Sequence, residues 1–95
     1  MKSVLQDETD ERLMLMLRAL ANPARLQLFH HLRANNDANC HHLVEALPLS
    51  QSTVSEHLQR LKDAGLIRGE PHGASRTYVV DDDALAWLKE TVSTL

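Results

Sequence analysis

Apolar residues recur at helical spacing near the start of the chain, which predicts a first helix over residues 7–21. Its apolar surface is wide, because Met14 and Met16 point to different sides of a helix. We therefore expect part of this helix to meet a second subunit instead of its own core. The periodic apolar residues are Leu13, Leu17 and Leu20.

A second helix is indicated by Asn22 and Pro23, which are typical of an N-cap and a first helical position. It is expected to run to about Ala34. A polar loop over residues 35–37 separates it from a short third helix over residues 41–46. The residues expected to be buried in the second helix are Leu26, Phe29 and Leu32.

A fourth helix is predicted over residues 51–64, between Ser50 as its N-cap and Gly65, where a left-handed residue usually follows a helix. Pro48 ends the third helix, so only a short turn joins the two. This pair predicts a helix-turn-helix. The core-facing residues of the fourth helix are Val54, Leu58 and Leu61.

After the fourth helix the apolar period changes from helical to extended. Residues 66–68 and 77–80 flank a loop with Pro71 and Gly73, which predicts a hairpin, or wing, over residues 68–78. Aspartates at 81–83 then begin a last helix, 82–95. The predicted fold is mainly α with a small β-hairpin: one winged helix-turn-helix domain over residues 1–95, in the order ααααββα.

Length and composition limit the function classes. The 95 residues suit one compact domain and leave no room for a catalytic one, and we find no phosphate loop, carboxylate pair or metal helix, so no enzyme is expected. No stretch is long and apolar enough to span a membrane, and acids follow Lys2, so we expect a cytoplasmic protein without a membrane partner. The single cysteine excludes an intrachain disulfide.

The charge is unevenly distributed. A net charge of −3 argues against a nucleic-acid partner, but eight of the thirteen acids fall in residues 1–17 and 77–95. Residues 18–76 hold seven of the ten basic residues and only five acids. A basic face in this middle part is therefore compatible with DNA.

The outer face of the fourth helix begins with short polar side chains. Ser52 and Ser55, with Gln51 and Thr53, let the helix N-terminus approach DNA and hydrogen-bond base edges or phosphates. For any one of these serines taken alone, a solvated helix face is the first interpretation. The short turn before the helix and the basic hairpin after it favour DNA.

Three ordered motifs carry a family resemblance: LANPARL at 20–26, LSQSTVSEHL at 49–58 and LKDAGLI at 61–67. Together they resemble ArsR/SmtB-type transcriptional repressors, over residues 18–80. The resemblance implies a homodimer formed through helices 7–21 and 82–95, binding to an inverted-repeat operator in double-stranded DNA, and release by an effector. The expected dimer residues are Met14, Met16, Leu17, Trp87, Leu88, Val92 and Leu95.

The same resemblance places the fourth helix and the wing at the operator. Glu56 departs from the family pattern, because an acid near phosphates weakens binding unless it accepts from a cytosine amino group or turns to Arg60. For His57, packing beside Leu58 is an equal alternative to DNA contact. The expected DNA-binding residues are Gln51, Ser52, Thr53, Ser55, His57, Arg60 and Arg76.

Neither metal site that the resemblance implies is complete. Asn39 and His41 occupy the positions of a paired-cysteine pattern, and residues 82–95 lack the histidines of a second site. We therefore expect no cofactor. Three interpretations of Cys40 stay open: a structural residue, a zinc or copper(I) ligand together with His42, or a redox sensor.

A function from another class competes with DNA binding. A winged-helix module that binds protein would have the same fold, because fold does not fix function. Only the serine-rich face of the fourth helix and Arg76 argue against it.

Overall fold

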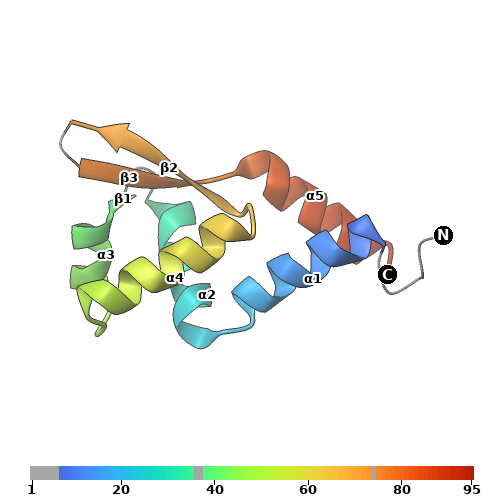
Figure 1. Cartoon of the computed structure of the whole chain (residues 1–95), viewed down its shortest axis with the longest axis horizontal. Coiled ribbons are helices and arrows are strands. Elements are labelled where there is room, and N and C mark those ends of the chain that lie inside the picture. Colours follow the sequence, from blue (N-terminus) through green and yellow to red (C-terminus); the bar gives the residue numbers. More distant parts are fainter. Residues whose placement is uncertain (1–6, 36–37, 74) are drawn as a thin grey trace.

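The computed structural model describes the backbone of residues 7–35, 38–73 and 75–95, and their side chains except at 38–41, 46, 72 and 75. It confirms the winged helix-turn-helix and the predicted order of helices and hairpin strands, and it adds one short strand (Figure 1). No described helix has the length and apolar character needed to cross a membrane. The elements are α1 (Glu8–Leu20), α2 (Pro23–Ala34), β1 (Ala38–Asn39), α3 (Cys40–Ala46), α4 (Gln51–Asp63), β2 (Ile67–His72), β3 (Ser75–Val80) and α5 (Asp82–Ser93).

The predicted helix starts are real N-caps. A side-chain oxygen accepts a hydrogen bond from the backbone N–H three residues on: Asn22 at 3.0 Å, Ser50 at 3.2 Å and Asp81 at 3.0 Å. Each bond satisfies one of the N–H groups that a helix leaves without an internal partner. Asp7 caps α1 by accepting from the N–H groups of Thr9 at 2.8 Å and Asp10 at 3.3 Å.

Gly65 ends α4 and turns the chain into the wing. Its φ of +77° is in the left-handed region. The N–H of Gly65 donates to the carbonyl of Lys62 at 2.9 Å, and the N–H of Leu66 donates to the carbonyl of Leu61 at 3.1 Å. These two bonds form a Schellman motif, which fixes the direction in which β2 leaves the helix.

The wing belongs to a three-stranded antiparallel sheet of order β1-β3-β2. In the hairpin, Ile67 lies opposite Val80 and His72 opposite Ser75. Strand β1 adds two pairs to the other edge of β3, with Ala38 opposite Tyr78. The sequence analysis did not predict β1, because two residues are too few to show an alternating pattern.

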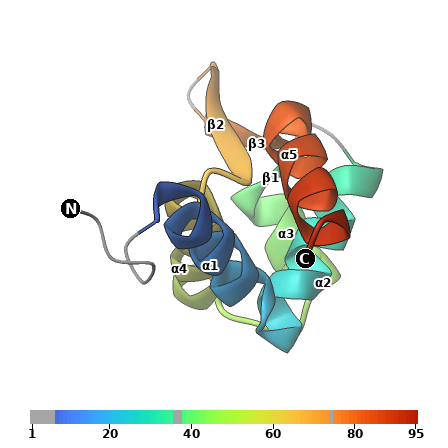
Figure 2. The same cartoon turned by 90° about the vertical axis from the view of Figure 1, so that its right-hand side faces the viewer.

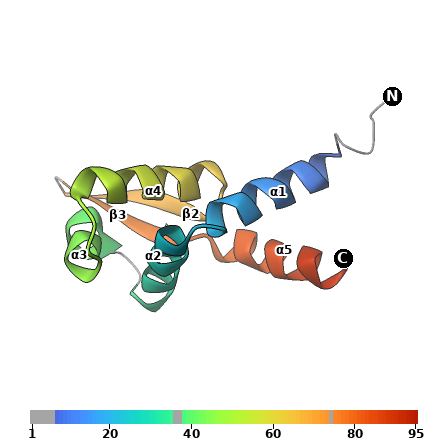
Figure 3. The same cartoon turned by 90° about the horizontal axis from the view of Figure 1, so that it is seen from below.

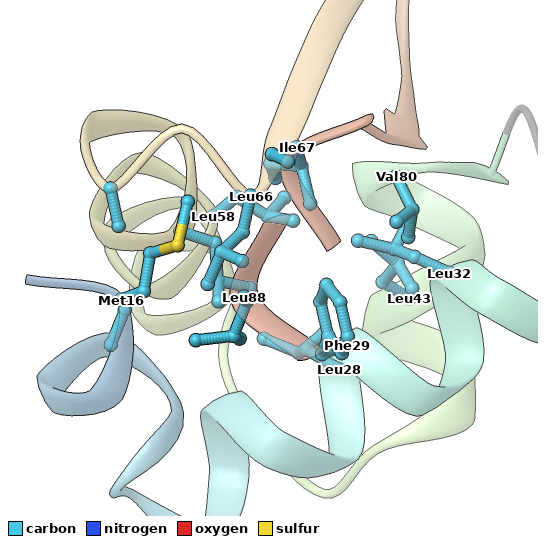
Figure 4. Close-up of a cluster of buried hydrophobic side chains, with 14 of the residues drawn as sticks. Met16, Leu28, Phe29, Leu32, Leu43, Leu58, Leu66, Ile67, Val80 and Leu88 are labelled. Carbon is cyan, nitrogen blue, oxygen red and sulfur yellow. The ribbon is translucent and has the colours of Figure 1, made fainter. Parts of the chain in front are cut away.

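One apolar core joins the helices and the base of the wing (Figure 4). Three helices contribute side chains with almost no exposed surface: Met16 from α1, Leu28 and Leu32 from α2, and Leu58 and Leu61 from α4. Leu66 and Ile67 extend this core under the hairpin. The position of α4 is therefore set by its packing against α1, α2 and β2.

Three sequence predictions about burial are corrected by this packing. Leu26 is 40% exposed, and Leu28, which is 0% exposed, occupies the core position of α2. Met16 and Leu88 were expected to face a second subunit, but they are 0% and 6% exposed in the single chain. Both side chains fill the core of their own chain and offer no surface to a partner.

The molecule is elongated, with principal extents of 47 × 23 × 23 Å. Helices α1 and α5 lie at one end, together with the C-terminus, as Figures 1 and 2 show. The tip of the wing and the start of α4 lie at the opposite end (Figure 3). The two helices that the sequence assigns to dimerisation are therefore separated along the long axis from the start of α4.

Candidate nucleic-acid interface

The helix-turn-helix is held by apolar anchors on both sides of its turn. Leu43 and Leu47 bury the inner face of α3, and Leu49 packs against the core from the turn. Val54 and Leu58 anchor the following helix, as predicted. The opposite face of α4 is therefore turned to solvent along most of its length.

Three hydroxyl groups meet at the start of α4. The hydroxyl of Ser50 donates to that of Thr53 at 2.9 Å, and it lies 3.2 Å from the hydroxyl of Ser52. The side chains of Gln51, Ser52 and Ser55 are exposed, whereas Thr53 is half-buried. The predicted residues thus form a compact polar surface at a helix N-terminus, where the dipole favours a negatively charged group.

The middle of α4 carries acidic and amide groups beside Arg60. The amide Nε2 of Gln59 donates to Oδ1 of Asp63 at 2.7 Å, so this amide is already engaged within the helix. Glu56 and Arg60 are both exposed, and among the described residues no ion pair joins them. Glu56 therefore stays a carboxylate on the outer face of α4.

His57 faces α2 instead of standing with the serines. Its Nδ1 lies 3.4 Å from Nη1 of Arg25, and its ring is half-buried. Burial lowers the pKa of His57 below its ordinary value, and the positive charges of Arg25 and Arg60 lower it further, against the opposing effect of Glu56. The contact with Arg25 gives His57 a structural role between α4 and α2. A contact of His57 with DNA stays a prediction.

The sequence analysis did not single out Arg25. Its Nε donates to the carbonyl of Ala19 at 2.8 Å, and its Nη2 lies 3.4 Å from the carbonyl of Arg18. A signal was present in the sequence, since Arg25 stands three and four positions before Leu28 and Phe29. A cation at that spacing shares the buried side of its helix and needs a polar partner there.

The wing presents Arg76 on an exposed strand. Arg76 lies opposite Pro71, and its side chain crosses the backbone of Gly69, where a Cβ would come within 2.9 Å of Cδ of Arg76. Gly69 therefore leaves room for this side chain. On the other face of the hairpin, Arg68 lies 3.8 Å from Glu70.

Several predicted dimer residues are exposed on α1 and near the end of α5. Met14, Leu17 and Val92 are each more than 40% exposed, and Leu95 is 86% exposed. Trp87 is half-buried, with the guanidinium of Arg12 at 4.1 Å from its ring centroid. Leu15, which the sequence analysis did not select, is 49% exposed.

The residues considered for a metal site lie partly outside the described side chains, which do not include those of Asn39 and His41. Among the described residues no group of three or more His, Cys, Asp and Glu side chains could hold a metal ion. The side chain of Cys40 lies outside the described part, and His42 is exposed. Metal binding by Cys40 and His42 therefore stays a prediction.

Known proteins are similar to this chain in sequence. The family model for bacterial regulatory proteins of the arsR family matches residues 22–68. The HTH-type transcriptional repressor SmtB of Mycobacterium tuberculosis is 42% identical over 73 residues, which are 77% of this chain and 53% of the repressor. The chain thus spans about half the length of this relative.

Solved structures are similar in fold. A crystal structure of a possible transcriptional regulator for arsenical resistance has a TM-score of 0.75 and 30% identity, covering 83% of this chain and 81% of that one. A homodimeric winged helix-turn-helix DNA-binding domain of a possible ArsR-family regulator from Mycobacterium bovis has a TM-score of 0.78. The second likeness covers 98% of this chain and 87% of that one, but at 24% identity it bears on the fold alone.

Proposed function

This chain belongs to the arsR family of bacterial regulatory proteins, and we propose that it represses transcription by binding operator DNA as a homodimer. The observation that carries the proposal is the cluster of small polar side chains at the start of α4, at the same end of the molecule as the wing (Figure 3). A similar protein, 42% identical over 73 residues, is described as a transcriptional repressor, which supports it.

In this proposal the start of α4 enters the major groove. The exposed side chains of Gln51, Ser52 and Ser55 hydrogen-bond base edges, and Gln51 has the donor and acceptor that adenine needs. Thr53 is held by Ser50 and contacts the backbone of DNA. The N-terminal dipole of α4 favours a phosphate at the same place.

The wing supplies a contact that does not depend on sequence. Arg76 is exposed and its guanidinium is carried over Gly69, so it can reach a phosphate or the minor groove beside the half-site. Arg68 contributes less, because Glu70 lies near its guanidinium. The wing therefore strengthens binding, and α4 chooses the sequence.

Dimerisation through α1 and α5 would bring two α4 helices onto one DNA duplex. The exposed apolar side chains of Met14, Leu17, Val92 and Leu95 are the surface we assign to it. A twofold dimer that reads adjacent major grooves places its recognition helices about 34 Å apart. The operator is then an inverted repeat with the same spacing.

A gel-shift experiment with DNA from the promoter of the chain's own gene tests the proposal. We expect a shifted complex that an inverted-repeat fragment competes away and a scrambled fragment of equal length does not. The affinity should fall steeply with salt, because bound protein releases counterions from the phosphates. Equal competition by both fragments would contradict operator recognition.

A second candidate function is a winged-helix module that binds protein. The outward-facing Glu56 on α4 favours it, because a carboxylate repels phosphates. In that case the gel shift shows no complex at physiological salt. DNA binding is favoured over protein binding because the exposed residues Gln51, Ser52 and Ser55 at the start of α4 carry neutral side chains that can form hydrogen bonds.

A further inference from the structure

A small cleft lies where three helices meet, away from the serine cluster of α4. Residues of α1, the first turn of α2 and the last turns of α4 line it. Its volume of about 260 Å³ is below the usual range for pockets that hold drug-sized ligands. The cleft therefore suits a single small group. Its apolar lining residues are Leu15, Ala19 and Ala64.

Three arginines line this cleft, one from each helix: Arg18, Arg25 and Arg60. Arg18 and Arg60 are exposed, and neither forms an ion pair with the residues that the structure describes. The one carboxylate in the lining belongs to Asp63, and it accepts a hydrogen bond from Gln59. Positive charge in the cleft thus exceeds negative charge.

Arg25 is the fixed member of the three. It donates to the carbonyl of Ala19 and lies within 3.4 Å of both the carbonyl of Arg18 and the ring of His57. These contacts hold its guanidinium in place. The side chains of Arg18 and Arg60 have no such partners in the described structure, so they can close on a bound anion.

The neighbouring histidine reports the positive potential on this side of α4. Arg25 and Arg60 both lower the pKa of His57, after the larger effect of burial. The acidic groups nearby are Glu56, which acts in the opposite sense, and Asp63. An anion in the cleft would reduce the repulsion that these arginines exert on a protonated ring.

We propose that the cleft binds a phosphoryl group through Arg18 and Arg60, and that in the operator complex this group is a backbone phosphate next to the bases contacted by α4. Arginine suits the role, because its planar guanidinium donates two parallel hydrogen bonds to phosphate oxygens. The DNA part of the inference rests on the proposed function, whereas binding of a phosphoryl group does not.

Charge-removing variants test the DNA part, with a matched control. Arg18→Gln and Arg60→Gln should each weaken operator binding about threefold to tenfold and lower the salt slope by about one. Arg33→Gln removes the same charge from an exposed arginine of α2 that does not line the cleft, and it should change neither quantity. Circular dichroism shows whether each variant is folded. An equal loss in Arg33→Gln would overturn the inference, because it indicates only general charge.

Titration with inorganic phosphate in the absence of DNA tests the site itself. The ring resonances of His57, followed by NMR across pH, should show a higher pKa in saturating phosphate than in chloride at equal ionic strength. Arg18→Gln should abolish this rise. If phosphate binds but the Arg18 and Arg60 variants keep full operator affinity, the site is confirmed and its occupant is a free phosphate. If neither experiment responds to the variants, the inference is wrong.

Discussion

Nδ1 of His57 lies 3.4 Å from Nη1 of Arg25, and this contact joins α4 to α2. Because the guanidinium is always a donor, Nδ1 must accept, which requires a neutral ring with its proton on Nε2. Arg25 also donates to the carbonyl of Ala19 at the end of α1. A single cation thus connects three helices, and protonation of His57 removes one of the connections.

The first prediction concerns pH. The folded pKa of His57 lies below its ordinary value of 6.5, so the unfolded chain binds a proton first as pH falls. The stability that the neutral ring contributes is therefore complete above about pH 6.5 and is lost as pH falls through the lowered pKa. Urea unfolding of wild type and His57→Gln between pH 7 and pH 5 measures it.

At fixed protein concentration, the free energy of unfolding should fall more for wild type than for His57→Gln over this range. All other titrating groups are common to the two proteins, so the difference isolates His57. Parallel losses in the two proteins would show that the Arg25 contact does not depend on protonation.

The second prediction compares two leucines of α2. Leu28→Ala should cost about 2–5 kcal/mol of unfolding free energy, because a fully buried side chain leaves a cavity. Leu26→Ala changes the same atoms two positions away but on a side chain that is 40% exposed, and it should cost less than about 1 kcal/mol. Chemical denaturation of both variants gives the comparison. Similar losses of unfolding free energy in the two variants would indicate that Leu26 is buried in the core.

These leucines also show where sequence patterns are ambiguous. Leu26, Leu28, Phe29 and Leu32 are all apolar, and more than one stripe through them has helical spacing. The packing of α2 against α4 and β3 decides which of these leucines is buried, and Leu28 is the one with no exposed surface. The spacing alone does not show which stripe will find a partner.

Local signals were more informative than stripes. The sequence predicted the helix starts at Asn22, Ser50 and Asp81, because an N-cap depends only on local sequence. The side chain of each accepts a hydrogen bond from the backbone N–H three residues later. The cleft of Arg18 and Arg60 could not be predicted in this way. It joins residues more than forty positions apart, and their approach depends on how α1 packs on α4.

The third prediction concerns the wing. Arg76→Ala should weaken binding to operator and to unrelated DNA by similar factors and lower the salt slope by about one, because a phosphate contact carries no sequence information. Lys89→Ala, on the exposed surface of α5, is the matched loss of one positive charge and should leave both affinities unchanged. Fluorescence anisotropy at several salt concentrations measures the slopes. An unchanged slope in Arg76→Ala would place the wing away from DNA.

The fourth prediction concerns the dimer. Leu17→Glu should give a monomer by light scattering at micromolar concentration, because it introduces a charge into an exposed apolar surface of α1. Leu26→Glu alters a leucine of similar exposure on α2 and should remain a dimer. The monomer should bind operator much more weakly, since one half-site remains. A wild-type chain that is monomeric yet binds operator with full affinity would contradict the proposed assembly.

The ratio of operator affinity to unrelated-DNA affinity, measured at physiological salt for wild type and Gln51→Ala, tests the central claim most directly. If the start of α4 reads bases, the wild-type ratio should be about 10³ or more. Gln51→Ala should then weaken operator binding by about 1–3 kcal/mol and leave binding to unrelated DNA unchanged, so the ratio falls. A wild-type ratio near one, or equal losses on both DNAs, would contradict sequence recognition by α4.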